Sequence, residues 1–227
     1  MWNKNVREEL IAIYDRLYRF FGPQHWWPGE SKFEIIVGAI LTQSVSWKNV
    51  EVAIDNLKKQ GLLTVEGIAG IERDKLAQLI KPTLYYNQKA DKLKRFCAYI
   101  KENYGGDILK LLDKNTTDLR SELLSIKGIG RETADSIILY AAQKPIFVVD
   151  AYTRRIFHRM GFFKEDEGYQ DMQDFFMSNL PSDVKMFNEY HALIVALGKE
   201  YCTLKNPVCD KCPLNAMPCI GCLSLKK

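Results

Sequence analysis

Five of the six cysteines lie near the end of the sequence, and their spacing is typical of a metal site. Four of them follow the pattern Cys202-x6-Cys209-x2-Cys212-x6-Cys219. Clustered cysteines more often bind a metal or a cluster than form disulfides. Four thiolates from one short loop can hold a [4Fe–4S] cluster or a tetrahedral zinc ion. The two wide outer gaps favour the iron–sulfur cubane, and Cys222 is an alternative fourth ligand.

One carboxylate stands between an apolar run and an amphipathic segment. Asp150 follows Val148 and Val149 and precedes a helical pattern. An aspartate in this place is commonly a helix N-cap. A carboxylate with apolar neighbours can also stabilise an oxocarbenium ion and activate a water, which is the chemistry of glycosidic-bond cleavage. The two interpretations are compatible, and both stay open at this point.

A glycine-rich turn precedes this carboxylate in the chain. Gly128 and Gly130 flank one apolar residue, with Lys127 and Arg131 on either side. Glycine allows a positive φ and a close approach of the backbone to a ligand. The free N–H groups of a helix that begins near Gly130 suit a DNA phosphate. The alternative is a plain turn between two helices.

The charge distribution is compatible with such a partner. The net charge of the 227 residues is +4, but residues 120–160 and residues 199–227 each carry a net +3, which leaves −2 elsewhere. Two basic segments suit a phosphate backbone, and scattered solubility charge is the alternative. The composition, with 47% hydrophobic and 26% charged residues, excludes disordered, collagen-like and coiled-coil classes.

The apolar runs fall far short of the roughly 20 residues that span a bilayer, and the first residues are charged rather than apolar. We therefore expect a cytoplasmic protein without a membrane partner. A DNA partner would make it nucleoid-associated, and we expect it to act as a monomer.

The elements that must position these residues are helices. Apolar residues recur at three- and four-residue spacing, and no period-two run is long enough to predict a strand, although residues 147–149 form a short candidate. The expected helices span 6–20, 32–43, 46–60, 73–80, 86–104, 117–125, 131–141, 150–160, 168–178 and 183–198. Ser31 and Glu34 form a capping-box pattern at the start of the second. The sequence therefore predicts an all-α protein.

Taken together, Lys127 to Gly130, Val148 to Asp150 and the cysteine loop resemble the endonuclease III superfamily of DNA glycosylases over nearly the whole chain. The resemblance implies a two-lobed helix-hairpin-helix fold with a C-terminal [4Fe–4S] loop at 202–219. Residues 30–145 would form a six-helix barrel lobe that ends in the hairpin. Residues 1–29 plus 146–227 would form the second lobe, with the substrate cleft between the two.

The same resemblance assigns roles to residues. Asp150 would be the catalytic carboxylate, and Lys127, Gly128, Gly130 and Arg131 would grip double-stranded DNA. Bifunctional members carry a lysine at the position of Glu132, where it forms a Schiff base with the sugar. A carboxylate cannot do so, which predicts a monofunctional enzyme. Glu132 would be a second carboxylate of the cleft, and the alternative is a solvated first-turn acid that the helix dipole favours. The last cysteine gap encloses six residues rather than the family's five.

The aromatic N-terminal half resembles the 3-methyladenine DNA glycosylase III branch. The resemblance implies that Trp26 or Trp27 and Trp47 stack on a flipped base. Gln43, at a helix end beside Trp47, could fill the space left in the duplex or be a plain surface amide. An alkylated purine is positively charged, and indole faces attract cations. Packing in the core is the alternative role for each tryptophan.

The leading hypothesis is thus a monofunctional glycosylase for alkylated purines such as 3-methyladenine. The alternatives are an endonuclease III-like glycosylase and AP lyase for oxidised pyrimidines, a non-catalytic protein that binds damaged DNA, and an unrelated helical zinc protein.

Overall fold

The computed structural model describes residues 4–219, and all regular structure in that range is helical, without a strand. The chain divides into two compact units. One comprises Met1–Trp26 and Pro145–Lys227, and the other comprises Trp27–Lys144. The sequence predicted these boundaries after residues 29 and 145. No helix in the described range is long and apolar enough to cross a membrane.

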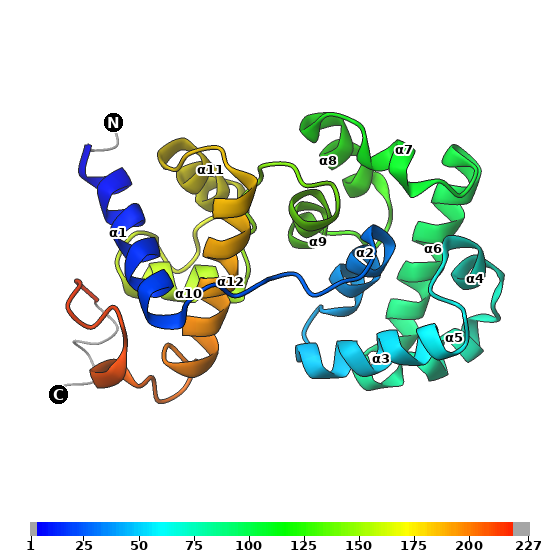
Figure 1. Ribbon diagram of the computed structural model, residues 1–227, viewed down its shortest axis with the longest axis horizontal. Helices are drawn as coiled ribbons and strands as arrows, with labels where there is room; N and C mark the ends of the chain where they lie inside the picture. Colours follow the sequence, from blue (N-terminus) through cyan, green and yellow to red (C-terminus); the bar gives the residue numbers. More distant parts are fainter. Residues whose placement is uncertain (1–3, 220–227) are drawn as a thin grey trace. The chain divides into compact units, whose positions relative to one another are not determined.

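The unit Trp27–Lys144 is a cluster of helices around a long central helix, α6 (Figure 1). Its elements are α2 (Lys32–Leu41), α3 (Trp47–Lys59), α4 (Val65–Gly70), α5 (Arg73–Leu79), the 3-10 helix η1 (Lys81–Thr83), α6 (Tyr86–Tyr104), α7 (Ile108–Leu112), α8 (Thr116–Ser125), α9 (Arg131–Ser136) and the π-helix η2 (Ile137–Ala141).

The start of α2 follows the predicted capping pattern. The Ser31 hydroxyl accepts a hydrogen bond from the Glu34 N–H at 3.1 Å. In the usual capping box, the glutamate side chain accepts from the N–H of the N-cap residue. Here the Glu34 carboxylate accepts instead from the N–H of Glu30, at 3.3 Å. One orphan donor of the first turn is satisfied in this way.

A buried lysine closes the other end of α2. Lys89 of α6 is only 2% exposed, and its ammonium donates to the carbonyls of Leu41, at 2.9 Å, and of Thr83. Burial and the charge of Lys92 lower the pKa of Lys89 to about 8. The lysine supplies the last carbonyl of α2 with the donor that a helix end lacks.

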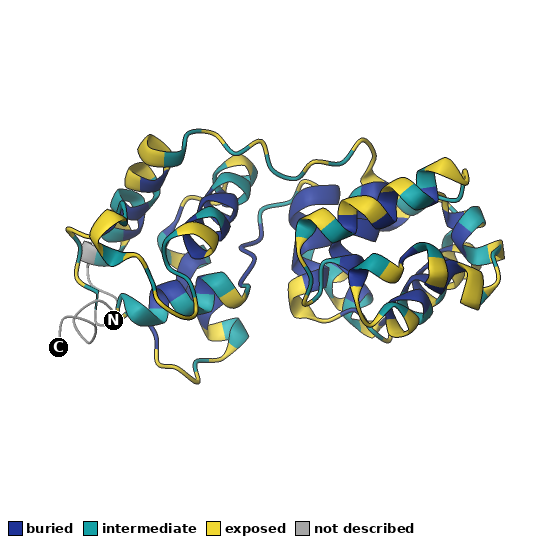
Figure 2. Ribbon diagram, turned by 90° about the horizontal axis from the view of Figure 1, so that it is seen from below, coloured by how far each residue is buried: buried dark blue, intermediate teal, exposed yellow. Residues whose placement is uncertain are grey.

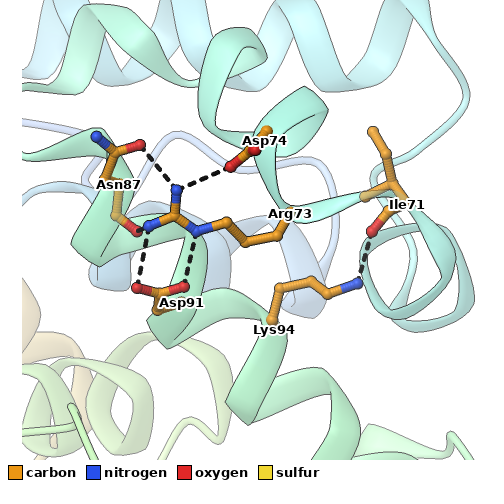
Figure 3. Close-up of polar contacts among 6 residues, drawn as sticks. All are labelled: Ile71, Arg73, Asp74, Asn87, Asp91 and Lys94. Carbon is orange, nitrogen blue, oxygen red and sulfur yellow. Dashed lines mark hydrogen bonds and ion pairs between the residues drawn. The ribbon is translucent and has the colours of Figure 1, made fainter.

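Arg73 ties α5 to the start of α6 (Figure 3). Its guanidinium donates to both carboxylate oxygens of Asp91, at 3.0 and 3.3 Å, and to the side chain of Asn87 at 3.1 Å. Lys94, one turn further along α6, donates to the carbonyl of Ile71 at 2.6 Å. These bonds hold the segment between α4 and α5 on the central helix.

The other unit consists of α1 (Lys4–Phe21), α10 (Ala151–Arg159), α11 (Tyr169–Asn179), α12 (Val184–Glu200) and the 3-10 helix η3 (Cys209–Lys211). Its core is aromatic. Phe147 stacks on Phe176 with ring centroids 4.0 Å apart, and Phe157 meets Phe176 edge-on at 4.8 Å. The buried Tyr190 hydroxyl of α12 donates to the carbonyl of Leu10 in α1 at 2.8 Å. The buried faces of these helices appear dark blue in Figure 2.

Residues 147–149, the short strand candidate, run as a buried segment without a partner strand. Side chains satisfy its backbone instead. The Gln173 amide donates to the carbonyl of Phe147 at 2.7 Å, and the Tyr169 hydroxyl accepts from the N–H of Val149 at 3.5 Å. Because α11 supplies these partners, the segment enters the core without a sheet.

Two features depart from the expected helices. The short helices α4 and α7 were not expected, and each spans only one or two turns. The helix expected over 131–141 is α9 followed by the π-helix η2. A π-turn adds about one residue to the helical repeat, and the pattern does not reveal it here because residues 133–141 are all buried.

Candidate functional site

Asp150 caps α10, and its two carboxylate oxygens have different partners. Oδ1 accepts from the backbone N–H of Thr153 at 2.7 Å and from the Thr153 hydroxyl at 2.9 Å. Oδ2 lies 3.6 Å from Nε2 of His191 on α12. The N-cap interpretation of Asp150 is therefore confirmed, and the cap engages one oxygen while the other faces a different helix.

The carboxylate of Asp150 is stabilised in its ionised form. Burial by itself raises the pKa of an aspartate, but the nearby imidazole of His191, together with the two Thr153 donors, holds the pKa of Asp150 below its usual value. An ionised carboxylate in a buried place is the form that stabilises a developing sugar cation.

His191 was missed in the sequence analysis. The residue is 6% exposed and lies in the middle of α12. No spacing rule links it to Asp150, because the two belong to helices that are far apart in the sequence. Only the packing of α10 against α12 brings them together.

The glycine-rich turn joins α8 to α9 as the predicted helix-hairpin-helix. The Ile129 N–H bonds to the carbonyl of Ile126 at 3.0 Å, which closes the turn. Arg120 of α8 and Asp135 of α9 then form a bidentate ion pair at 2.7 and 3.1 Å, with the Asp135 side chain fully buried. This pair fixes the two helices on either side of the turn.

The surface of this hairpin is basic. Gly128 has φ +107°, and a Cβ there would lie 2.7 Å from the stem of Lys92, so the position requires glycine. Gly130 is the N-cap of α9 and has no side chain to cap the first amides. The side chains of Lys127 and Arg131 are exposed. Glycine at these two places leaves the backbone accessible between two cations.

Glu132 is also exposed, in the first turn of α9. An acidic residue is favoured there by the helix dipole, which is the plainer of the two roles that the sequence suggested for it.

Gln43 lies in the turn after α2 and is held from two sides. Its amide nitrogen donates to the Thr133 hydroxyl of α9 at 2.8 Å, and its amide oxygen accepts from the ammonium of Lys92 on α6. Burial and the charge of Arg95 lower the pKa of Lys92. The turn that carries Gln43 is thereby attached to the helix that follows the hairpin.

Two of the three singled-out tryptophans come together in the unit Trp27–Lys144. The Trp27 and Trp47 rings meet edge-on with centroids 5.0 Å apart. The ring centroid of Tyr140, in the π-helix, lies 5.0 Å from that of Trp27, and these two rings are tilted relative to each other. Gly38 of α2 makes room for them, because a Cβ there would lie 3.2 Å from the Trp27 indole.

The indole of Trp47 is further oriented by Glu51, whose carboxylate accepts from the indole N–H at 2.7 Å. Glu51 was not singled out in the sequence, although its four-residue spacing from Trp47 on a helix is the signal that finds it. Trp26 belongs to the other unit, where Lys199 lies 5.9 Å from the centre of its ring.

Four cysteines line one small pocket of about 30 Å³ at the end of α12. They are Cys202, Cys209, Cys212 and Cys219, and Cys222 lies outside the described residues. Arg159 of α10 donates to the sulfur of Cys202 at 3.2 Å and to the carbonyl of Thr203 at 2.8 Å.

The donor set of this pocket fits a thiolate-bound cluster. The pKa of Cys212 rises to about 11 because the thiol is buried and three other cysteines repel its thiolate. A bound cation reverses this effect, since metal ligation deprotonates thiols. Within residues 4–219, no three His, Cys, Asp or Glu side chains already stand in ligating positions. The four sulfurs thus share one pocket without forming a closed site.

Comparison with known proteins places the chain among DNA repair enzymes. Residues 37–182 match the family described as the HhH-GPD superfamily base excision DNA repair protein. The chain is also 49% identical over 212 residues to a protein of Methanocaldococcus jannaschii named “Putative DNA repair glycosylase”, covering 93% of this chain and 96% of that protein.

Two solved structures are similar over most of the chain. A trapped covalent intermediate of endonuclease III with DNA aligns with a TM-score of 0.85 and 21% identity, over 100% of both chains. The H. pylori 3-methyladenine DNA glycosylase MagIII bound to 1,N6-ethenoadenine aligns with a TM-score of 0.74 and 29% identity, over 86% of this chain and 97% of that one.

Proposed function

Because the chain belongs to the HhH-GPD superfamily of base excision DNA repair proteins, we propose that it is a monofunctional DNA glycosylase that releases alkylated purines such as 3-methyladenine from double-stranded DNA. The observation that carries this proposal is the carboxylate of Asp150. One oxygen is fixed by the α10 cap, and the ionised group lies in a largely buried place.

The reaction is hydrolysis at C1′ of a flipped nucleotide. The bond from C1′ to the base nitrogen breaks, and its electron pair leaves with the base, which neutralises the positive charge of an alkylated purine. The Asp150 carboxylate stabilises the cationic sugar and orients a water, whose oxygen forms the new bond to C1′. The proton lost by that water passes to the carboxylate or to solvent.

The absence of a lysine at position 132 supports hydrolysis without strand cleavage. A Schiff base with the sugar requires an amine, and Glu132 offers a carboxylate. The expected product is an intact strand with an abasic site. Release of oxidised pyrimidines, or of no base at all, would favour the alternative enzymes or the binding protein.

The aromatic cluster supports an alkylated purine as the substrate. The Trp47 ring packs perpendicular to the Trp27 ring, and its N–H donates to the Glu51 carboxylate. An indole that donates to a carboxylate is a suitable face for a cationic ring. The similarity to the H. pylori 3-methyladenine enzyme points to the same class of base.

Replacing Trp47 with alanine is expected to weaken base release selectively. Loss of one stacking face is worth about 1–3 kcal/mol, which corresponds to roughly a 5- to 150-fold lower kcat/KM. The loss should be larger for cationic 3-methyladenine than for neutral hypoxanthine. Both are measured by chromatography of the released base. Tyr18→Ala, which removes an exposed ring that stacks on Tyr14 in α1, is the control, and equal effects of the two variants would refute the stacking role.

The hairpin is proposed to hold a DNA phosphate through Lys127 and Arg131. Lys127→Ala or Arg131→Ala should weaken binding to all DNA sequences alike and reduce the slope of log K against log [salt] by about 1. The slope is measured by fluorescence anisotropy between low and moderate salt. Lys59→Ala, at the exposed end of α3, should leave the slope unchanged. The same slope in all four proteins would place the hairpin charges away from phosphate.

The cysteine pocket is proposed to hold a [4Fe–4S] cluster through Cys202, Cys209, Cys212 and Cys219. When bound, such a cluster cross-links the loop after α12 and contributes to folding. Arg159 orients the loop through the sulfur of Cys202 and the neighbouring carbonyl. The cross-linked loop then holds its basic residues in fixed positions.

Cys209→Ala is expected to remove the brown colour of anaerobically purified protein and to lower its melting temperature, because a thiolate ligand is lost. Iron and sulfide analysis and thermal unfolding check both effects. Cys222→Ala is the matched control and should retain iron, because Cys219 is the proposed fourth ligand. A colourless wild-type protein with bound zinc would contradict the cluster. Loss of iron in Cys222→Ala would show that Cys222, and not Cys219, is the fourth ligand.

A further inference from the structure

His191 and Asp150 form a buried pair between two helices of one unit. Asp150 begins α10, and His191 lies on α12, which packs against it. The Oδ2 to Nε2 distance is 3.6 Å, and both side chains are largely buried, at 11% and 7% exposure. Because Thr153 occupies Oδ1, the imidazole faces the oxygen that the cap leaves available.

The other charged groups near Asp150 are directed elsewhere. Arg154 of α10 donates to the carbonyl of Glu167, and Arg155 donates to the carbonyls of Gly198 and Cys202 at 2.9 and 2.8 Å. From α11, the hydroxyl of Tyr169 reaches the backbone N–H of Val149 and not the carboxylate. His191 is therefore the titratable group that acts on Asp150 from a neighbouring helix in the described part of the chain.

We propose that His191 is a positioning residue for the reaction, which keeps Asp150 ionised and holds its Oδ2 in place for the sugar cation. The inference rests on the proposed function, since it assumes that Asp150 acts on C1′. Without the imidazole, burial disfavours the charged carboxylate, and the pKa of Asp150 rises. A protonated Asp150 cannot stabilise the oxocarbenium ion, so activity would be lost first at low pH.

The test is the pH profile of base release by His191→Gln. Glutamine places a neutral amide donor near the position of Nε2 and removes the imidazole ring. The ratio of variant to wild-type kcat/KM should approach one at pH 8.5. It should fall toward pH 5, by roughly tenfold for each unit by which the pKa of Asp150 in the variant exceeds the assay pH. His158→Gln is the matched control, because the His158 ring meets the backbone carbonyl of Phe163 at 3.0 Å and is outside the Asp150 pair.

A second measurement does not depend on activity. The carboxyl carbon of Asp150, labelled with 13C and assigned by comparison with Asp150→Asn, gives the pKa of Asp150 in the wild type and in the variant. Should His191→Gln fail to fold, His191→Asn replaces it. A higher pKa of Asp150 in the variant supports the proposal.

The outcomes separate the two claims. An acidic limb that does not move, a uniform loss at every pH, or an unchanged pKa of Asp150 would overturn the role of His191. If the wild-type protein releases no base, the proposed function fails instead, while the NMR titration still decides whether His191 stabilises the carboxylate.

Discussion

Asp150→Asn is expected to lower the rate of base release by a factor of about 10² to 10⁴, the range that a positioned acid–base group contributes. DNA binding and folding should persist. Asparagine caps a helix about as well as aspartate, so its amide oxygen can still accept from the N–H of Thr153. What the variant loses is the negative charge that is proposed to face the sugar. Single-turnover release of 3-methyladenine and binding to duplex DNA measure the two effects separately.

Asp183→Asn is a closely matched control for this variant. Asp183 is the N-cap of α12 and accepts from the N–H of Met186 at 2.6 Å, in the same unit of the chain, but it is exposed. The same change from carboxylate to amide should leave base release within about twofold, as expected for a surface cap. Full activity of Asp150→Asn, or equal losses in both variants, would remove Asp150 from the reaction.

The largest expected effect on stability comes from the hairpin. Arg120→Met should lower the free energy of unfolding by about 3–5 kcal/mol, because it leaves the buried Asp135 carboxylate without its guanidinium partner. Methionine retains the apolar stem of the arginine, so the effect reports the charge rather than the packing. Urea unfolding followed by circular dichroism measures the change.

A surface pair provides the comparison for this prediction. Asp74 is 90% exposed and pairs with Arg73 at 3.0 Å (Figure 3). Exposed ion pairs are worth about 0–1 kcal/mol, so Asp74→Ala should change stability by no more than that. The double variant Arg120→Met with Asp135→Leu should recover part of the loss, because no buried charge remains. An Arg120→Met protein as stable as Asp74→Ala would show that the buried pair does not hold the hairpin.

The all-helical fold and the helix-hairpin-helix were predictable from the sequence because periodicity and glycine placement are local signals. The long helices, such as α6 over Tyr86–Tyr104, have enough turns for an apolar stripe to be recognised. The helices α4 and α7 span only six and five residues, too few for a period. The π-helix after α9 was also beyond reach, since residues 133–141 are all buried and leave no one-sided apolar stripe whose phase an extra residue could shift.

The residues of the candidate site show the same difference between local patterns and tertiary packing. Asp150 was found because an acid before an amphipathic helix is a local pattern. His191 was not, because its contact with Asp150 depends on how α10 packs on α12. Likewise, the tryptophans were visible as residues, but the pairing of Trp27 with Trp47 depends on the space that Gly38 leaves. The sequence therefore indicated which side chains could take part in the site. It did not predict which side chains contact each other, because those contacts depend on how the helices pack.

The most direct test of the central claim is incubation of the wild-type protein with duplex DNA treated with dimethyl sulfate. Free bases are identified by chromatography of the supernatant, and the strand is examined on a denaturing gel before and after alkali. We predict released 3-methyladenine and a strand that breaks only after alkali, since Glu132 cannot form the Schiff base for cleavage. Release of no methylated purine would contradict the account, and a strand that is cut without alkali would contradict its hydrolytic mechanism.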